Sequence, residues 1–174
     1  MQVRCYVALG ANLGDAVATV TAAFDDLAAI PGAHLLAASS LYRTAPVGLR
    51  AQPDFINAAA AIELDSAVLP APTFLAELFA IEARFGRRRT LPNAPRTLDL
   101  DLLLYGDEVS ADSACTLPHP RMHQRAFVLA PLAELAPQLH IPGHGLITAL
   151  LAACADQVIE RLPAPTATTA EKHR

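Results

Sequence analysis

Two aspartates stand two residues apart in an otherwise apolar segment, RTLDLDLLL at residues 96–104. If this segment is a strand, Asp99 and Asp101 share one face, about 7 Å apart, and the leucines face the other way. Two such carboxylates repel each other and lose hydration, and a divalent cation would remove both costs. Mg²⁺ takes a few carboxylates together with phosphate oxygens and water. The pattern therefore predicts a magnesium site, although DxD is common and an ordinary solvent-facing strand surface stays open.

A cluster of arginines precedes the two aspartates. Gly86 is followed by Arg87, Arg88 and Arg89, and Arg96 stands just before the acidic segment. In isolation this cluster could simply stabilise the C-terminal end of a helix. Next to an acidic strand it favours binding of a polyphosphate, because guanidinium groups grip phosphate oxygens through two N–H donors. The chain has no GxxxxGK[ST] phosphate loop, so arginine and metal must do this work.

Two further segments carry side chains suited to a ligand. The first, PHPRMHQRAF at 118–127, offers His119 and Arg125 as phosphate contacts, and a zinc pair of His119 and His123 lacks any supporting Cys or His motif. The second, QPDFINAA at 52–59, alternates Phe55 with Asn57. An aromatic ring and an amide on one strand face suit a flat heterocycle, although core packing is the likelier explanation of that segment taken alone.

The elements that must position these residues follow a recognisable order. Apolar runs predict strands at 3–9, 34–43, 55–64 and 98–105, and helical periodicity predicts helices at 15–30 and 73–85. Loops are expected at 44–54 and 87–97, and residues 44–54 and 86–96 are expected to close over bound substrates. The order predicts an α+β ferredoxin-like sandwich, with helices packed on a mainly antiparallel sheet. A C-terminal extension follows, its clearest helix at 146–155. We expect one domain over 1–162 and a disordered tail at 163–174.

Composition narrows the function classes. The net charge of −4 and the 5% aromatic content argue against a nucleic-acid surface. No stretch approaches the roughly 20 apolar residues of a membrane span, and the N-terminus has no signal-peptide pattern. Cys5, Cys115 and Cys154 are odd in number and widely spaced, which indicates buried thiols rather than disulfides or a zinc ribbon. These features predict a cytoplasmic protein.

Taken in order from Tyr6 to about Gly145, the segments resemble the 6-hydroxymethyl-dihydropterin pyrophosphokinase family. The matching pieces are ALGANLG at 8–14, SLYRTAPVG at 40–48, QPDFINA at 52–58, Ile81-Glu82 with Gly86-Arg87, PRTLDLD at 95–101, and Pro118-His119 with Met122, Arg125 and Phe127. The resemblance implies a ferredoxin-like fold. It also implies transfer of the diphosphate group of ATP to the hydroxymethyl group of a reduced pterin, with release of AMP.

The resemblance also implies residue roles. Asp99 and Asp101 would hold two Mg²⁺ ions, and Arg87 and Arg96 would be catalytic. The nucleotide would contact Arg87, Arg89, Arg96, Leu102, Thr116, His119 and Arg125. The pterin would lie between Phe55 and Phe127, within a pocket completed by Gly10, Thr44, Ala45, Val47 and Asn57. Because the family's site lies within one chain, we expect a monomer.

Some positions depart from the family pattern, and two other functions stay open. The family often has tryptophan at the position of Asn93, a basic residue at that of Thr90 and an aromatic residue at that of Pro120. These differences affect loop closure and the contacts to adenosine. One alternative is a DxD nucleotide-sugar transferase that uses manganese, for which the chain is short. The other is a ferredoxin-like RNA-binding module, which would need a basic sheet face with interleaved aromatics.

Overall fold

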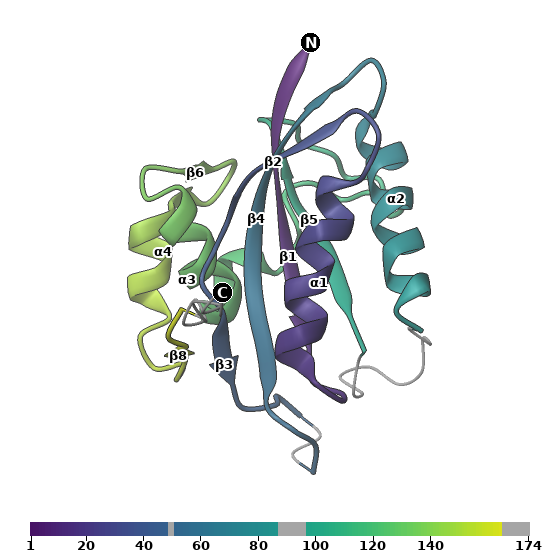
Figure 1. The fold of residues 1–174 in the computed structure, drawn as a ribbon. Coiled ribbons are helices and arrows are strands. Elements are labelled where there is room, and N and C mark those ends of the chain that lie inside the picture. Colours follow the sequence, from purple (N-terminus) through teal and green to yellow (C-terminus); the bar gives the residue numbers. More distant parts are fainter. Residues whose placement is uncertain (49–50, 87–96, 165–174) are drawn as a thin grey trace, which may run out of the picture.

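The computed structural model describes residues 1–48, 51–86 and 97–164 (Figure 1). Its elements in chain order are β1 (Gln2–Ala11), α1 (Ala16–Ala28), β2 (Ala33–Ala38), β3 (Tyr42–Thr44), β4 (Phe55–Asp65), α2 (Ala71–Arg84), β5 (Asp99–Tyr105), the 3-10 helix η1 (Met122–Gln124), α3 (Ala126–Leu135), β6 (His140–Ile141), β7 (Gly145–Leu146), α4 (Ile147–Ala153) and β8 (Glu160–Arg161).

The main sheet has the order β5-β1-β4-β3-β8, and β2 also pairs with β4. All these pairings are antiparallel, and the long β1–β4 ladder runs from Gln2 opposite Asp65 to Ala11 opposite Ile56. Strands β1 and β2 are thus parallel to each other with β4 between them, which is the split βαβ arrangement of the ferredoxin-like sandwich. The predicted fold class is confirmed.

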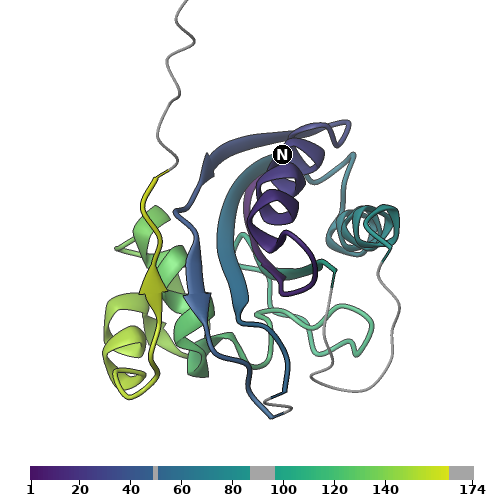
Figure 2. The ribbon, with the colours of Figure 1, turned by 60° about the horizontal axis from the view of Figure 1, so that its bottom comes forward.

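Helices cover both faces of this sheet (Figures 1 and 2). Alternate residues of β1 show why, since Val7 and Leu9 pack with α1 and α2, whereas Tyr6 and Ala8 pack with α3 and α4. We call these two clusters the α1/α2 core and the α3/α4 core. The first belongs to the two βαβ halves, and the second is built by the C-terminal extension.

The strand predicted at 34–43 is two strands, and the continuous prediction was wrong. Ser39 interrupts the ladder between them: its N–H still donates to the Ala59 carbonyl at 2.9 Å, but the Ala59 N–H donates to the Ser39 hydroxyl at 2.8 Å and not to a backbone carbonyl. Residues 39–41 lie opposite residues 58–59, so one extra residue bulges between Ala38 and Tyr42. This bulge separates β3, which leads into the candidate site, from β2.

The predicted helices at 15–30 and 73–85 are confirmed as α1 and α2. Asp15 caps α1 as expected, since its carboxylate accepts from the Ala18 N–H at 3.0 Å. Helix α3 was missed, because it is apolar almost throughout, contains Pro131 and has little polar–apolar periodicity. Within the described residues, no helix combines the length and the apolar character needed to cross a membrane.

Candidate active site

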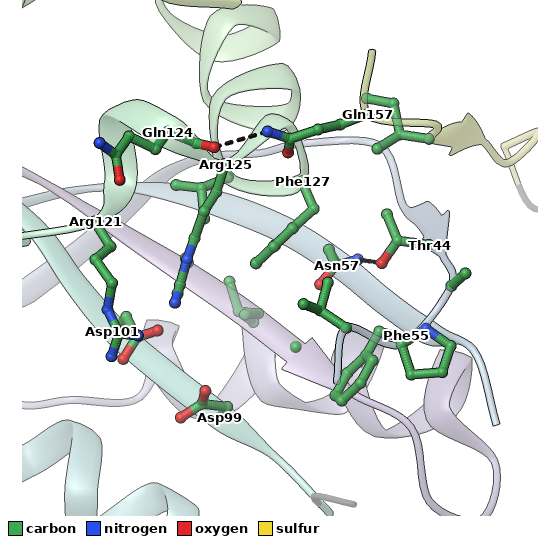
Figure 3. Close-up of a pocket in the computed structure, with 18 of the residues that line it drawn as sticks. Thr44, Phe55, Asn57, Asp99, Asp101, Arg121, Gln124, Arg125, Phe127 and Gln157 are labelled. Carbon is green, nitrogen blue, oxygen red and sulfur yellow. Dashed lines mark hydrogen bonds between the residues drawn. The ribbon is translucent and has the colours of Figure 1, made fainter. Parts of the chain in front are cut away.

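A cavity of about 890 Å³ opens where the strands carrying the predicted residues end, on the side of the sheet that α3 and α4 cover (Figure 3). Strand β1 contributes Gly10, and β5 contributes Asp99 and Asp101. The cavity gathers eleven of the residues predicted from sequence: Gly10, Thr44, Ala45, Val47, Phe55, Asn57, Asp99, Asp101, His119, Arg125 and Phe127. The fold thus brings together segments that lie more than 100 residues apart in the chain.

The two aspartates lie on one face of β5, as their spacing predicted. Asp99 pairs with Gly10 and Asp101 with Ala8 in the β1–β5 ladder, and both carboxylates line the cavity. The intervening Leu100 is buried in the α1/α2 core on the opposite face. Apolar packing on one face therefore fixes the strand and leaves the carboxylates on the other.

His119 lies beside this carboxylate pair, with its Nε2 4.0 Å from Oδ1 of Asp101. The pKa of His119 is lowered to about 4, first by burial and then by the charges of Arg125 and Arg121, while the charge of Asp99 acts in the opposite direction. The imidazole is therefore neutral near pH 7, so its contact with Asp101 is not an ion pair. Its Nδ1 accepts from the Arg121 N–H at 3.3 Å, which leaves the ring proton on Nε2, toward Asp101.

The opposite part of the cavity is lined by aromatic rings and by a side-chain amide. Asn57 is buried and its amide nitrogen donates to the Thr44 hydroxyl at 2.9 Å, so the side chain is held in one orientation. Figure 3 shows Phe127 and Phe55 on opposite sides of Asn57. A Cβ atom at Gly10 would lie 3.5 Å from the Asn57 side-chain oxygen, an ordinary van der Waals contact, so the β1 backbone passes close to this amide. The Arg125 guanidinium lies 5.6 Å from the Phe127 ring centroid.

A smaller pocket of about 210 Å³ adjoins the cavity. It contains Leu102 and Thr116, which among the described residues are the two predicted nucleotide contacts that do not line the larger cavity, together with Phe79 of α2. The Leu102 side chain is itself buried in the α1/α2 core, so it can offer only a small part of its surface. Asp101 and His119 line both spaces and so mark their junction.

Some of the predicted residues lie outside the described part of the chain, and some of the residues that line the cavity were not predicted. Arg87, Arg89 and Arg96, and almost all of the loop predicted at 87–97, lie outside the described residues. Conversely, nine lining residues were not among the predicted ones. Four of them, Ala8, Leu9, Pro46 and Val128, are apolar and stand next to or near predicted residues in the chain. The other five, in chain order, are Arg121, Gln124, Gln157, Val158 and Ile159. The first two stand inside the PHPRMHQRAF segment and could have been found there. The other three belong to the C-terminal extension, which has no motif.

Comparison with known proteins agrees with this geometry. The family model 7,8-dihydro-6-hydroxymethylpterin-pyrophosphokinase (HPPK) matches residues 6–137. A 2-amino-4-hydroxy-6-hydroxymethyldihydropteridine pyrophosphokinase of Pseudomonas aeruginosa is 45% identical over 160 residues, covering 92% of this chain and 97% of that protein. The protein of that name in Haemophilus influenzae is 40% identical over 160 residues, covering 92% and 98%.

Solved structures show the same likeness at the level of the fold. A structure described as HPPK-DHPS in complex with substrates has a TM-score of 0.68 and 11% identity, and the match covers 94% of this chain. The chain spans 47% of that longer chain, about half its length. A Plasmodium falciparum HPPK-DHPS with pteroate gives a TM-score of 0.67 and 13% identity over 87% of this chain. The resemblance seen in the sequence is confirmed, and the chain belongs to the 7,8-dihydro-6-hydroxymethylpterin-pyrophosphokinase family.

Proposed function

We propose that this chain transfers the diphosphate group of ATP to the hydroxymethyl group of 6-hydroxymethyl-7,8-dihydropterin and releases AMP. One observation supports this most directly. A single cavity joins a wall of two aromatic rings and an oriented amide to a wall of two carboxylates, a neutral histidine and an arginine. The first wall suits a flat heterocycle with polar edges, and the second suits a polyphosphate.

In the proposed reaction the pterin hydroxyl oxygen attacks the β-phosphorus of ATP. A new oxygen–β-phosphorus bond forms while the bond from that phosphorus to the α–β bridging oxygen breaks, and AMP leaves with the electron pair. The hydroxyl proton passes to solvent. Phe55 and Phe127 would hold the ring by stacking, and Asn57 would recognise its edge, where an unpaired polar group would penalise other substrates. No side chain is needed as a covalent nucleophile.

The carboxylate pair fits magnesium that is held partly by the substrate. Among the described residues, no group of three or more His, Cys, Asp or Glu side chains is placed to hold a metal alone. Two carboxylates completed by phosphate oxygens and water are the usual protein share of such a site. We therefore propose that Asp99 and Asp101 hold two Mg²⁺ ions when ATP is present. The ions would supply charge neutralisation and activation of the hydroxyl.

The two adjoining spaces support a division of the nucleotide between them. We propose that the nucleoside enters the smaller pocket beside Phe79 and Thr116, and that the phosphates pass the junction at Asp101 and His119. Arg125 would then contact the phosphates in the larger cavity. Arg87, Arg89 and Arg96 are proposed from the sequence as further phosphate contacts. We also propose that the enzyme is a cytoplasmic monomer.

The direct test is AMP formation from ATP on addition of the reduced hydroxymethylpterin. AMP should appear only when the pterin, ATP and magnesium are all present, in amounts equal to the pterin consumed. A sugar transferase would instead consume a nucleotide-sugar with manganese, and an RNA-binding module would retain RNA in a shift assay. Absence of AMP formation from correctly folded protein would overturn the proposal.

A further inference from the structure

Gln157 makes two hydrogen bonds to the backbone on either side of Arg125. Its side-chain carbonyl accepts from the Ala126 N–H at 2.9 Å, and its amide nitrogen donates to the Gln124 carbonyl at 2.8 Å, the contact drawn in Figure 3. The Gln157 N–H also donates to the Cys154 carbonyl at 3.0 Å, at the end of α4. The residue thus connects the end of α4 to the turn between η1 and α3.

The start of α3 explains why such a connection is needed. Arg125 is the N-cap residue of α3, but its side chain makes no capping bond to the helix. Serine, threonine, aspartate or asparagine usually supplies this acceptor, because the first N–H groups of a helix have no partner within it. Gln157 supplies it from 31 residues away. The Arg125 side chain can therefore extend into the cavity instead of capping its own helix.

We propose that Gln157 is a positioning residue of the active site, which holds the Arg125 turn so that Arg125 and Phe127 face the substrates. The inference rests on the proposed function for the roles of those two residues. Gln157 lies on the cavity wall with its neighbours Val158 and Ile159. Two bonds bracket one residue, so they restrain both the position and the rotation of the Arg125 backbone. A single bond would leave the rotation free.

Three substitutions at Gln157 distinguish the contributions of its two side-chain hydrogen bonds. Gln157→Ala removes both, and Gln157→Asn is one methylene too short to reach them. Gln157→Glu keeps an acceptor for the Ala126 N–H and loses the donor to the Gln124 carbonyl. We expect Gln157→Ala and Gln157→Asn to raise the KM for ATP, and for pterin, roughly fivefold to thirtyfold, the range expected from the loss of one to two net hydrogen bonds. Gln157→Glu should fall between them and the wild type.

Two readouts distinguish positioning from simple stabilisation. Hydrogen exchange of the Ala126 amide should accelerate in Gln157→Ala, and the amide of Leu129, which donates to the Arg125 carbonyl at 3.0 Å, should stay protected. In an Arg125→Ala background, Gln157→Ala should add little to the KM for ATP, because the residue it positions is gone. Asp65→Asn is the control, since it weakens the ion pair with the N-terminal amine at the far end of β4 and should leave both KM values unchanged.

The outcomes separate the inference from the function on which it rests. Unchanged KM values in Gln157→Ala, with accelerated exchange at Ala126, would overturn the positioning role and leave the pyrophosphokinase activity standing. Additive effects of Gln157→Ala and Arg125→Ala would overturn it as well. Wild-type enzyme that makes no AMP would overturn the proposed function. Calorimetry with a non-hydrolysable ATP analogue would then decide the inference, and equal affinity of wild type and Gln157→Ala would end it.

Discussion

At the scale of single residues, the site depends on side chains that line two adjoining spaces. Asp101 and His119 line both the larger cavity and the smaller pocket. The low pKa of His119, caused first by burial and then by Arg125 and Arg121, keeps it neutral among these charges. A neutral imidazole can donate one hydrogen bond to a phosphate without competing with a cation for the carboxylates. The junction thus suits a ligand that extends through both spaces.

The carboxylate pair gives the sharpest residue-scale prediction. Asp101→Ala should leave the melting temperature near that of the wild type, because Leu100 and Leu102 still pack on the other face and a repulsive pair is relieved. Turnover should fall about a thousandfold if roughly 4 kcal/mol of transition-state stabilisation is lost. AMP production and melting temperature should be measured across a magnesium titration.

Asp107→Ala, in the exposed turn after β5, is the matched control and should keep full turnover. Asp99→Ala should behave like Asp101→Ala, and the double variant should be little worse than either, because both residues serve one cluster. Near-normal turnover in a folded Asp101→Ala or Asp99→Ala protein would remove these residues from the site.

The aromatic wall gives a second residue-scale prediction. Phe127→Ala should weaken pterin binding by about 1–3 kcal/mol, the range for one aromatic platform and the area it buries. Phe79→Ala, in the smaller pocket, should instead weaken ATP binding and spare the pterin. Calorimetry with each ligand on both variants checks this. Equal losses of both ligands in Phe127→Ala would contradict the assigned wall.

Much of the site could be predicted from residue types, and the remainder could not for a physical reason. The side chains of Asp99, Asp101 and Asn57 follow strand alternation, which local sequence reveals. Gln157 acts through backbone groups 31 and 33 residues away, and its partners are set by how α4 packs beside α3. A glutamine in an extension has no local signal of such a contact.

At the scale of elements, a polar network attaches α3 to the sheet. Glu134 of α3 accepts from the Tyr42 hydroxyl at 2.7 Å and from both the N–H and the hydroxyl of Ser40 at 2.9 Å, and Arg161 of β8 lies 3.5 Å away. Burial alone would raise the pKa of Glu134, but these hydrogen bonds and the Arg161 charge outweigh it and lower the pKa. Burial first, and then the hydrogen bond to Glu134 and its charge, raise the pKa of Tyr42 to about 12.

This network predicts an acid-dependent share of stability. Because folding lowers the pKa of Glu134, its stabilisation is fully present above the ordinary value of 4.5 and is lost as the pH falls through the lower folded value. Glu134→Gln should cost about 1–3 kcal/mol of unfolding free energy at pH 7, the value of hydrogen bonds to a charged group. The cost should shrink toward pH 3. Urea unfolding at both pH values measures it.

Glu77→Gln, at a half-buried position of α2 and outside this network, is the matched control. It should show no such loss at either pH. A Glu134→Gln variant as stable as the wild type at pH 7, or equally destabilised at pH 3, would show that the carboxylate charge is not what attaches α3.

The elements themselves were predictable where periodicity was strong. The capped, amphipathic α1 and the apolar strand β5 both lie close to their expected ranges. The bulge at Ser39 and the nearly all-apolar α3 were not predictable, because each is decided by what packs against it. In α3, six of ten residues are buried, four of them in the α3/α4 core, so polar–apolar alternation has little room to appear.

At the scale of the whole molecule, one sheet supports two cores. Strands β1, β4 and β5 contribute side chains to both cores, so unfolding of these strands would expose both cores at once. The cavity lies at the margin of the α3/α4 core, with Phe127 partly packed against it. The C-terminal extension therefore both completes the second core and builds one wall of the site.

The expected single domain over 1–162 leads to a final prediction, for which the cysteines provide natural probes. Cys5 lies in the α1/α2 core and Cys154 in the α3/α4 core, and both are buried. Burial raises the pKa of Cys5 to about 12 and also raises that of Cys154, so neither thiol should react until its own core opens. If the chain is one cooperative unit, both should become reactive at the same urea concentration.

Leu129→Ala sharpens this test, because Leu129 is fully buried in the α3/α4 core and its truncation should cost about 2–5 kcal/mol. In one cooperative unit, the labelling midpoints of Cys5 and Cys154 should move together to lower urea, although the substitution touches only one core. Phe74→Ala, in the α1/α2 core, should produce the same joint shift from the other side. Pulsed thiol labelling with mass spectrometry of the peptides resolves the two sites. Labelling of Cys154 well before Cys5 in Leu129→Ala would mean that α3 and α4 unfold separately, and that the wall carrying Phe127 and Gln157 can open while the sheet stays folded.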